Sequence, residues 1–278
     1  MTARRPGFSL AEIMVALLIA GIIGIALARL IINQSRFVSQ QDGMLRARAG
    51  SRAALNILSG DLRAVTDSGL VQASTDSITV RAPYAFGVAC QQTLGMRVVS
   101  LLPTDSSLYR SSRASGYAWR DSTGAYVFVQ PAIVLNGACS TPAPYITTLG
   151  EAGWTARSVA VALNDPRIPV GTVVYLYQLV RYAFGPSVEI PGRRALWRTV
   201  LSTGARDELV TPFDSSARFL FLVGNAHAVQ AAPPAVLDSV RGVRVKLVGA
   251  SETAPQGRNQ PATFDLTTDI LFRNNARQ

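Results

Sequence analysis

The sequence has few of the side chains that catalysis and cofactor binding most often use. Among its 278 residues it has one histidine, His227, one lysine, Lys246, and two cysteines. It contains no GxSxG, HExxH, GxGxxG or P-loop pattern, so no nucleophile elbow, zinc-peptidase helix or phosphate loop is indicated. A lone histidine is more often a loop residue than a catalyst. We therefore expect a structural or assembly protein rather than an enzyme, without a cofactor or a metal site.

The two cysteines, Cys90 and Cys139, are too far apart for a CxxC redox or zinc motif. If the segment that contains them is exported, an oxidising compartment favours a disulfide between them. Such a bond would close a loop of about 50 residues and contribute about 2–4 kcal/mol to the free energy of unfolding. The alternative is a pair of buried free thiols. Because export is supported independently below, we expect the disulfide.

Acidic residues are scarce, since 17 Asp and Glu stand against 27 Lys and Arg and the formal net charge is +10. A basic surface can hold nucleic acid or another anionic polymer. The arginines are scattered from Arg29 to Arg277 without a dense block, which argues against a dedicated nucleic-acid site. DNA stays an alternative partner of the basic part of the chain that follows the N-terminal segment. That alternative predicts salt-dependent binding by the residues from about 34 onward.

Charge is absent from one long stretch near the N-terminus, the sixteen residues 13–28. The range 13–32, in which only Arg29 is charged, would span about 30 Å as a helix, which is the thickness of a bilayer core. Arg29 near one end can snorkel to the interface. Arg4 and Arg5 on the other flank favour a cytoplasmic N-terminus. The sequence therefore predicts a single membrane anchor, with the bulk of the chain outside.

Glu12 stands at the start of this apolar run, where a carboxylate costs on the order of 2.5–3.5 kcal/mol on insertion scales. One interpretation of the segment is a cleaved secretory signal, with the ALA at 26–28 as its cleavage site, and another is a plain signal anchor. The first leaves an acid in the apolar region and apolar sequence after the cut. The second gives no account of Glu12 or of Gly7 and Phe8. A glutamate drawn toward the headgroups is the simplest alternative.

The stretch GFSLAEIMVALLIAGIIG, residues 7–24, resembles the class III signal of type IV pilin-like proteins, the prepilins and pseudopilins. The resemblance implies that residues 1–7 are a leader, and that a membrane prepilin peptidase cuts after Gly7 and methylates Phe8. It implies that Glu12 pairs with the Phe8 amine of a neighbouring pilin subunit, because any other stagger leaves a charge unpaired in an apolar filament core. It also implies a single-pass protein of the bacterial inner membrane, with its head periplasmic or extracellular, that later enters a pilus or pseudopilus.

One helix is predicted over residues 8–65, about 87 Å long, because no proline occurs between Pro6 and Pro83. Residues 8–33 are its transmembrane half and residues 34–66 its amphipathic half. One face of the amphipathic half recurs at helical spacing: Phe37, Val38, Met44, Leu45, Ser51, Leu55, Leu58, Leu62 and Val65. We expect this stripe to pack on a head domain. Coiled-coil dimerisation is the alternative, although paired charges beside a narrow seam are not visible.

From residue 67 to residue 278 the chain consists of short β-rich runs separated by Gly, Pro, Ser, Asp and Asn. Several runs alternate apolar and polar residues, as in RGVRVKL, which predicts an antiparallel sheet with one wet face. The expected strands are 77–82, 96–102, 125–130, 171–184, 194–202, 218–224, 241–249 and 263–272. The predicted fold class is α+β, a long N-terminal helix packed on a mainly antiparallel β-sheet head. Residues 84–165, with both cysteines, are expected to form an insertion in that head.

Residues 51–65, SRAALNILSGDLRAV, resemble the helix end of PilW-type minor pilins and of the J-type pseudopilins of type II secretion. The resemblance implies a minor pilin that initiates or tips a type IV pilus, a filament of adhesion, motility and, in some cases, DNA uptake. A J-type pseudopilin at the pseudopilus tip is the first alternative. The second, from another class, is a secreted soluble β-domain with a binding or enzymatic role that begins at Arg29 behind an ordinary signal peptide.

Overall fold

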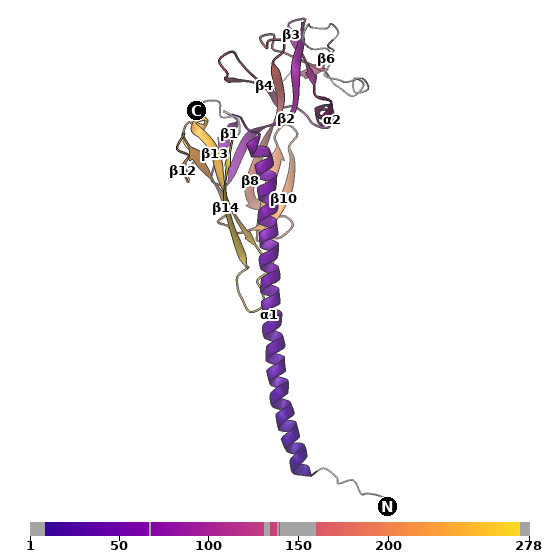
Figure 1. Ribbon diagram of the computed structural model, residues 1–278, viewed down its shortest axis with the longest axis vertical. Helices are drawn as coiled ribbons and strands as arrows, with labels where there is room; N and C mark the ends of the chain where they lie inside the picture. Colours follow the sequence, from indigo (N-terminus) through magenta and orange to yellow (C-terminus); the bar gives the residue numbers. More distant parts are fainter. Residues whose placement is uncertain (1–8, 67, 131–133, 138, 140–159, 273–278) are drawn as a thin grey trace, which may run out of the picture.

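The computed structural model describes residues 9–66, 68–130, 134–137, 139 and 160–272. The long N-terminal helix, α1 (Leu10–Arg63), has 54 residues and is about 81 Å long. Its C-terminal part lies against a β-rich head and its N-terminal part projects from that head (Figure 1). A long apolar N-terminal helix and a large antiparallel sheet make this an α+β fold, as predicted.

Within the described residues, the head is built on one antiparallel sheet of fourteen strands. Its main path runs β12-β11-β13-β10-β9-β8-β2-β3-β7-β6, with β1 beside β2, β14 beside β13, and the β4–β5 hairpin beside β8. The strands are β1 (Leu70–Ala73), β2 (Ser77–Thr93), β3 (Met96–Leu101), β4 (Gly116–Arg120), β5 (Tyr126–Val129), β6 (Val134–Gly137), β7 (Ala160–Leu163), β8 (Val173–Pro186), β9 (Arg194–Val200), β10 (Ala205–Phe213), β11 (Arg218–Val223), β12 (Ala228–Gln230), β13 (Val240–Ala250) and β14 (Thr263–Leu271).

The eight expected strands correspond to β2, β3, β5, β8, β9, β11, β13 and β14. The expected end of the first strand at residue 82 is wrong, because β2 continues to Thr93 and residue 84 lies inside it. The sequence interpretation missed the short strands β1, β4, β6, β7 and β12, the strand β10, the helix α2 (Pro103–Ser111) and the 3-10 turn η1 (Leu237–Ser239). Strands of three to five residues are too short to show alternation, and Pro212 weakens the strand signal of β10.

Two hydrophobic cores follow one another along β2 and β8. The first core joins α1 to the sheet, and among its members are Ala54, Leu58, Leu62, Ile78, Val180, Tyr182, Phe219 and Val245. The second core lies further along the same two strands, and it includes Ala85, Val99, Leu101, Tyr117, Val161, Leu163, Val174 and Leu176. The members of the second core come from 85–176. Described residues of the segment expected as an insertion, 84–165, therefore share a separate core with the start of β8.

The face of α1 that packs on the head differs from the predicted stripe. Its buried residues are Gly43, Ala47, Ser51, Ala54, Leu58 and Leu62. The prediction holds for the larger residues near the helix end and is wrong for Phe37, Val38, Met44 and Leu45, which are exposed. Small residues occupy the contact from Gly43 to Ser51 because the sheet comes very close to the helix there. A Cβ on Gly249 of β13 would collide with the carbonyl oxygen of Ala47, and the Gly249 amide donates to Ser51 Oγ at 3.1 Å.

Candidate functional site on helix α1

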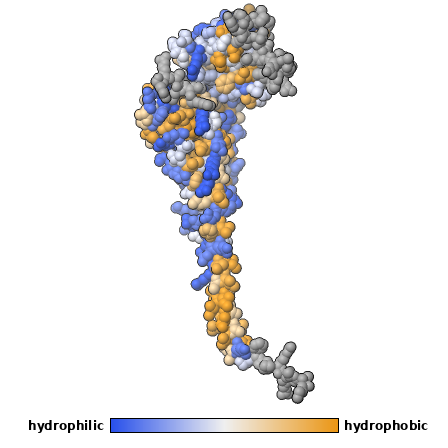
Figure 2. All heavy atoms as spheres, viewed as in Figure 1, coloured by the Kyte–Doolittle hydropathy of each residue, from blue (hydrophilic) through white to orange (hydrophobic). Residues whose placement is uncertain are grey.

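The most distinctive surface of the molecule is the bare segment of α1, Leu10–Ile32, in which every residue is exposed. Figure 2 shows it as an almost unbroken apolar column below the head. Soluble monomers rarely expose apolar patches of more than a few hundred Å². The helix is long and apolar enough to span a membrane, and none of its most apolar stretch of 18 residues is buried. The bare segment therefore has the length and composition of a membrane-spanning helix.

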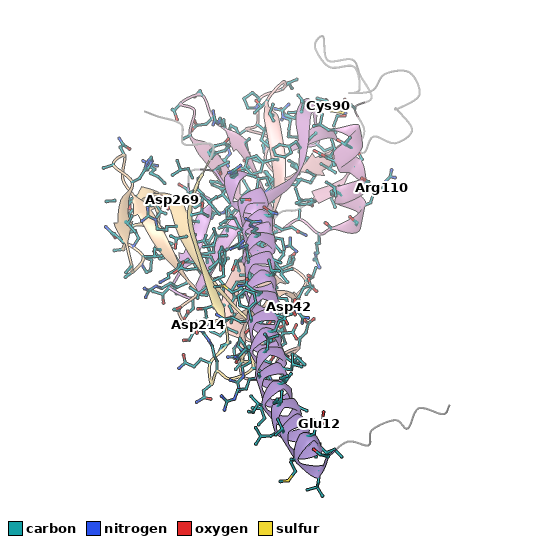
Figure 3. All side chains as sticks on the ribbon, turned by 60° about the horizontal axis from the view of Figure 1, so that its bottom comes forward. Glu12, Asp42, Cys90, Arg110, Asp214 and Asp269 are labelled. Atoms are coloured by element: carbon teal, nitrogen blue, oxygen red, sulfur yellow. A yellow bond between two sulfur atoms is a disulfide. The ribbon has the colours of Figure 1, made fainter. Side chains whose placement is uncertain are left out.

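Glu12 lies in the first turn of α1, at the far end of the molecule from Cys90 (Figure 3). Its amide donates to Ser9 Oγ at 3.2 Å, and Ser9 is the N-cap of the helix. The S-x-x-E spacing of these two residues is that of a capping box, a sequence signal that our interpretation missed. A carboxylate in the first turn is also stabilised by the helix macrodipole, by about 0.3–1 kcal/mol at an exposed site. Glu12 thus has a local role in starting the helix.

The other residues of the predicted N-terminal site, Gly7 and Phe8, lie outside the described residues. Cleavage after Gly7, methylation of Phe8 and its pairing with Glu12 stay predictions from the sequence.

After the polar residues 33–36, an exposed apolar stripe lies on the part of α1 beside the head. It consists of Phe37, Val38, Met44 and Leu45, which are 61%, 59%, 40% and 60% exposed. At 100° per residue, the four positions fall within about 120° of one another and are centred about 110° from the buried face of the helix. The exposed stripe therefore adjoins the face that packs on the head: Met44 lies at its edge, at the same helical angle as the buried Leu62.

The last turns of α1 are fixed to the sheet by a polar contact beside the first core. The Tyr182 hydroxyl donates a hydrogen bond to Asp61 Oδ2, and Arg198 Nε lies 3.8 Å from the same oxygen. Burial, together with the charge of Asp61, raises the pKa of Tyr182 far above the ordinary value for a tyrosine. Tyr182 therefore stays a hydrogen-bond donor at physiological pH. This contact and the close approach at Gly249 are two of the contacts that hold α1 on the head.

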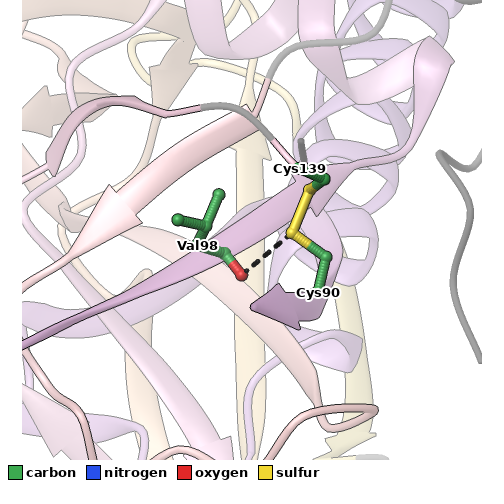
Figure 4. The surroundings of a disulfide bond; sticks show 3 residues. All are labelled: Cys90, Val98 and Cys139. Atoms are coloured by element: carbon green, nitrogen blue, oxygen red, sulfur yellow. Dashed lines mark hydrogen bonds between the residues drawn. A yellow bond between two sulfur atoms is a disulfide. The ribbon is translucent and has the colours of Figure 1, made fainter. Parts of the chain in front are cut away.

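Cys90 and Cys139, at opposite ends of the expected loop, are joined by a disulfide with their Cα atoms 5.9 Å apart. Cys90 Sγ also lies 3.4 Å from the carbonyl oxygen of Val98 (Figure 4). The bond links the end of β2 to the residue that follows shortly after β6. It lies in a small apolar cluster with Val98 and Ala162.

The described part of the head carries little that suggests chemistry. It contains no group of three or more His, Cys, Asp or Glu side chains that could hold a metal ion. His227 is exposed in the turn after β11. Several arginines are engaged within the head: Arg167 with Asp165, Arg194 with Asp76, Arg244 with Asp269, and Arg206 over the ring of Trp197. The basic charge of the head is therefore distributed among separate local contacts.

Comparisons of this chain with protein-family models, with curated proteins and with solved structures gave no match.

Proposed function

We propose that this chain is a minor pilin of the PilW type, a subunit that inserts in the membrane through α1 and assembles through the same helix at the tip of a type IV pilus or a related filament. The observation that carries this proposal is that the apolar surface of α1 extends past the membrane-spanning length. A plain anchor needs only the bare segment, Leu10–Ile32. The exposed stripe at Phe37, Val38, Met44 and Leu45 has no use in an isolated anchor, and it suits contact with the helices of neighbouring subunits.

The resemblance at residues 7–24 supplies the chemistry of assembly in this proposal. The amine created at Phe8 by the prepilin peptidase lies about one helical turn before Glu12. In the membrane it screens the carboxylate of its own chain, and in the filament it pairs with Glu12 of the next subunit. The cap at Ser9 is compatible with this role, because it uses the amide of Glu12 and leaves the carboxylate available. The large head, with its second core, suits a tip position, where it need not stack in many copies.

The proposal is tested by the N-terminal mass of the protein recovered from its native membrane or from sheared filaments. We expect a mature chain that begins at N-methylated Phe8. The variant Gly7→Val should keep its leader and stay out of filaments. Its matched control, Gly21→Val, lies on the bare segment with no atom of another element within 4 Å, and it should be processed normally. A native chain that begins at Arg29 would overturn the proposal in favour of a secreted soluble domain.

A further inference from the structure

The loop between β13 and β14, residues 251–262, extends from the head along α1 toward the bare segment (Figure 1). At its base, Ser251 and Ala262 lie against Gly43 of the helix. At its tip, the Ser35 hydroxyl donates to Gln256 Oε1 at 3.2 Å, and Gly257 lies beside the guanidinium of Arg36. Since Gly43 and Ser35 are eight residues apart, the loop follows α1 for about 12 Å. The loop tip is thus the part of the head nearest the bare segment.

The height of this tip is set by the helix. Ser35 comes three residues after Ile32, which is a rise of about 4.5 Å. The headgroup region on each side of a bilayer is about 5–7 Å thick. When α1 spans a membrane, an anchoring mode that this inference takes from the proposed function, the loop tip therefore lies at the level of the lipid headgroups.

In the described residues of α1 and of this loop, the charges at that level are all of one sign. Arg29 and Arg36 of α1 and Arg258 of the loop are exposed, and the stretch 13–41 contains no acid. The loop has one acid, Glu252, which lies at its head-side end.

The acids next to this region are held further from the bare segment. Arg46 lies 3.1 Å from Asp42 and 3.8 Å from Glu252. Glu189 lies in the turn between β8 and β9. This turn contacts the head-side end of the loop, where Arg193 donates to the Glu252 carbonyl oxygen at 3.5 Å. These acids thus lie at the head-side end of the loop, whereas Arg36 and Arg258 lie at its tip and Arg29 lies on the bare segment below it.

We propose that Arg29, Arg36 and Arg258 form a binding surface for the headgroups of anionic phospholipids. A guanidinium group binds phosphate through two parallel hydrogen bonds, which makes arginine well suited to this ligand. The loop holds Arg258 beside the helix through the contacts of Ser251 and Gln256, so the site combines side chains from two elements. The surface fixes the height and tilt of the head on the membrane before the subunit leaves it.

The test uses the full chain in a neutral detergent, titrated with short-chain phosphatidylglycerol or phosphatidylcholine and followed by native mass spectrometry. We expect tighter binding of phosphatidylglycerol. Because one arginine near an anionic surface contributes about a fivefold change in affinity, Arg258→Gln should weaken this binding about fivefold. Arg258→Lys should retain most of it. The matched control is Arg110→Gln, since Arg110 is an exposed arginine of α2 far from the bare segment (Figure 3).

Three outcomes would overturn the proposal: equal binding of the two lipids, an equal loss in Arg110→Gln, or displacement of the lipid by inorganic phosphate at matched ionic strength. The third would indicate a site for free phosphate. Insertion is measured first, as retention of the chain in vesicles after an alkaline wash. A chain that is washed off contradicts the membrane anchor itself, whereas an inserted chain without lipid preference contradicts only the headgroup site.

Discussion

Gly249 lies where β13 passes beneath Ala47 and Ser51, and the helix and the sheet are in contact there through backbone atoms. We expect Gly249→Ala to lower the free energy of unfolding of the full chain by about 1–3 kcal/mol, because a methyl group has no space and the backbones must separate. Thermal unfolding in a neutral detergent, followed by circular dichroism, measures this loss.

The matched control for that substitution is Gly60→Ala. Gly60 is also a glycine of the helix–head region, but no atom of another element lies within 4 Å of the position of its Cβ. Alanine is the better helix former, so this variant should be more stable by about 0.5–1 kcal/mol. Equal effects in the two variants would show that close packing at Gly249 does not determine the stability of the junction.

Asp165 gives the head a dependence on acid pH. Its buried carboxylate accepts two hydrogen bonds from the Arg167 guanidinium, each 2.9 Å long, and a third from the Arg167 amide. The hydrogen bonds from Arg167 hold the pKa of Asp165 below its usual range, although burial acts in the opposite direction. A carboxyl group with a lowered pKa in the folded state stabilises the fold above its unfolded pKa of about 3.9. That contribution is lost as the pH falls through the folded pKa.

We therefore expect Asp165→Asn to lower the free energy of unfolding at pH 7 by about 1 kcal/mol, a modest value because Arg167 is largely exposed and solvent screens the pair. The difference from the native chain should shrink as the pH falls below about 4 and through the lowered pKa of Asp165 in the folded state. Unfolding measured across this pH range tests the expectation. Asp207→Asn, at an exposed position of β10, is the control and should follow the native curve. A constant difference at all pH values would contradict the assignment.

At the scale of elements, α1 has a buried face that packs on the head and an exposed apolar stripe beside it. We expect the double variant Phe37→Ser/Leu45→Ser to leave the free energy of unfolding within about 0.5 kcal/mol of the native value, because both side chains are exposed. If the chain assembles as proposed, this variant should enter filaments poorly. Leu58→Ala should lower the free energy of unfolding by about 2–5 kcal/mol, since Leu58 is fully buried in the first core. Stability and filament content, measured side by side, would contradict this division if the exposed pair destabilised the head as much as Leu58→Ala does.

The elements also show what the sequence could predict. The long strands β8, β13 and β14 were recognisable because each has at least nine residues, either in a nearly continuous apolar run, as in β8, or with alternation, as in β14. The face of α1 that packs on the head was not, because hydrophobic periodicity favours the large side chains of Phe37 and Met44. The contact actually depends on Gly43, which lies against Ser251 and Ala262, and on Ala47, which fits the close sheet at Gly249. The spacing of Ser9 and Glu12 was a usable signal, whereas the partner of Tyr182, far along the chain, could be seen only in the structure.

At the scale of the whole molecule, the disulfide belongs to one of two successive parts of the head. Cys90 and Cys139 lie beside β3 and β7, next to the second core, and the first core contains neither. Reduction should remove about 2–4 kcal/mol of stability from the part that surrounds the second core. Hydrogen exchange should then become faster in the amides of β3 and β7 and stay unchanged in those of β13.

The double variant Cys90→Ser/Cys139→Ser should exchange like the reduced chain and show no further response to a reductant. Uniform acceleration throughout the head would show that the two cores unfold together.

The pair formed by β2 and β8 has a mechanical consequence. Both strands pass from one core to the other, and eleven residue pairs join them, from Ser77 with Ala183 to Val88 with Val173. A pull between the far end of the head and α1 loads these hydrogen bonds in shear, so that they bear the force together rather than opening one after another. A force applied at the second core is therefore transmitted along the backbones of β2 and β8 to the first core and to α1.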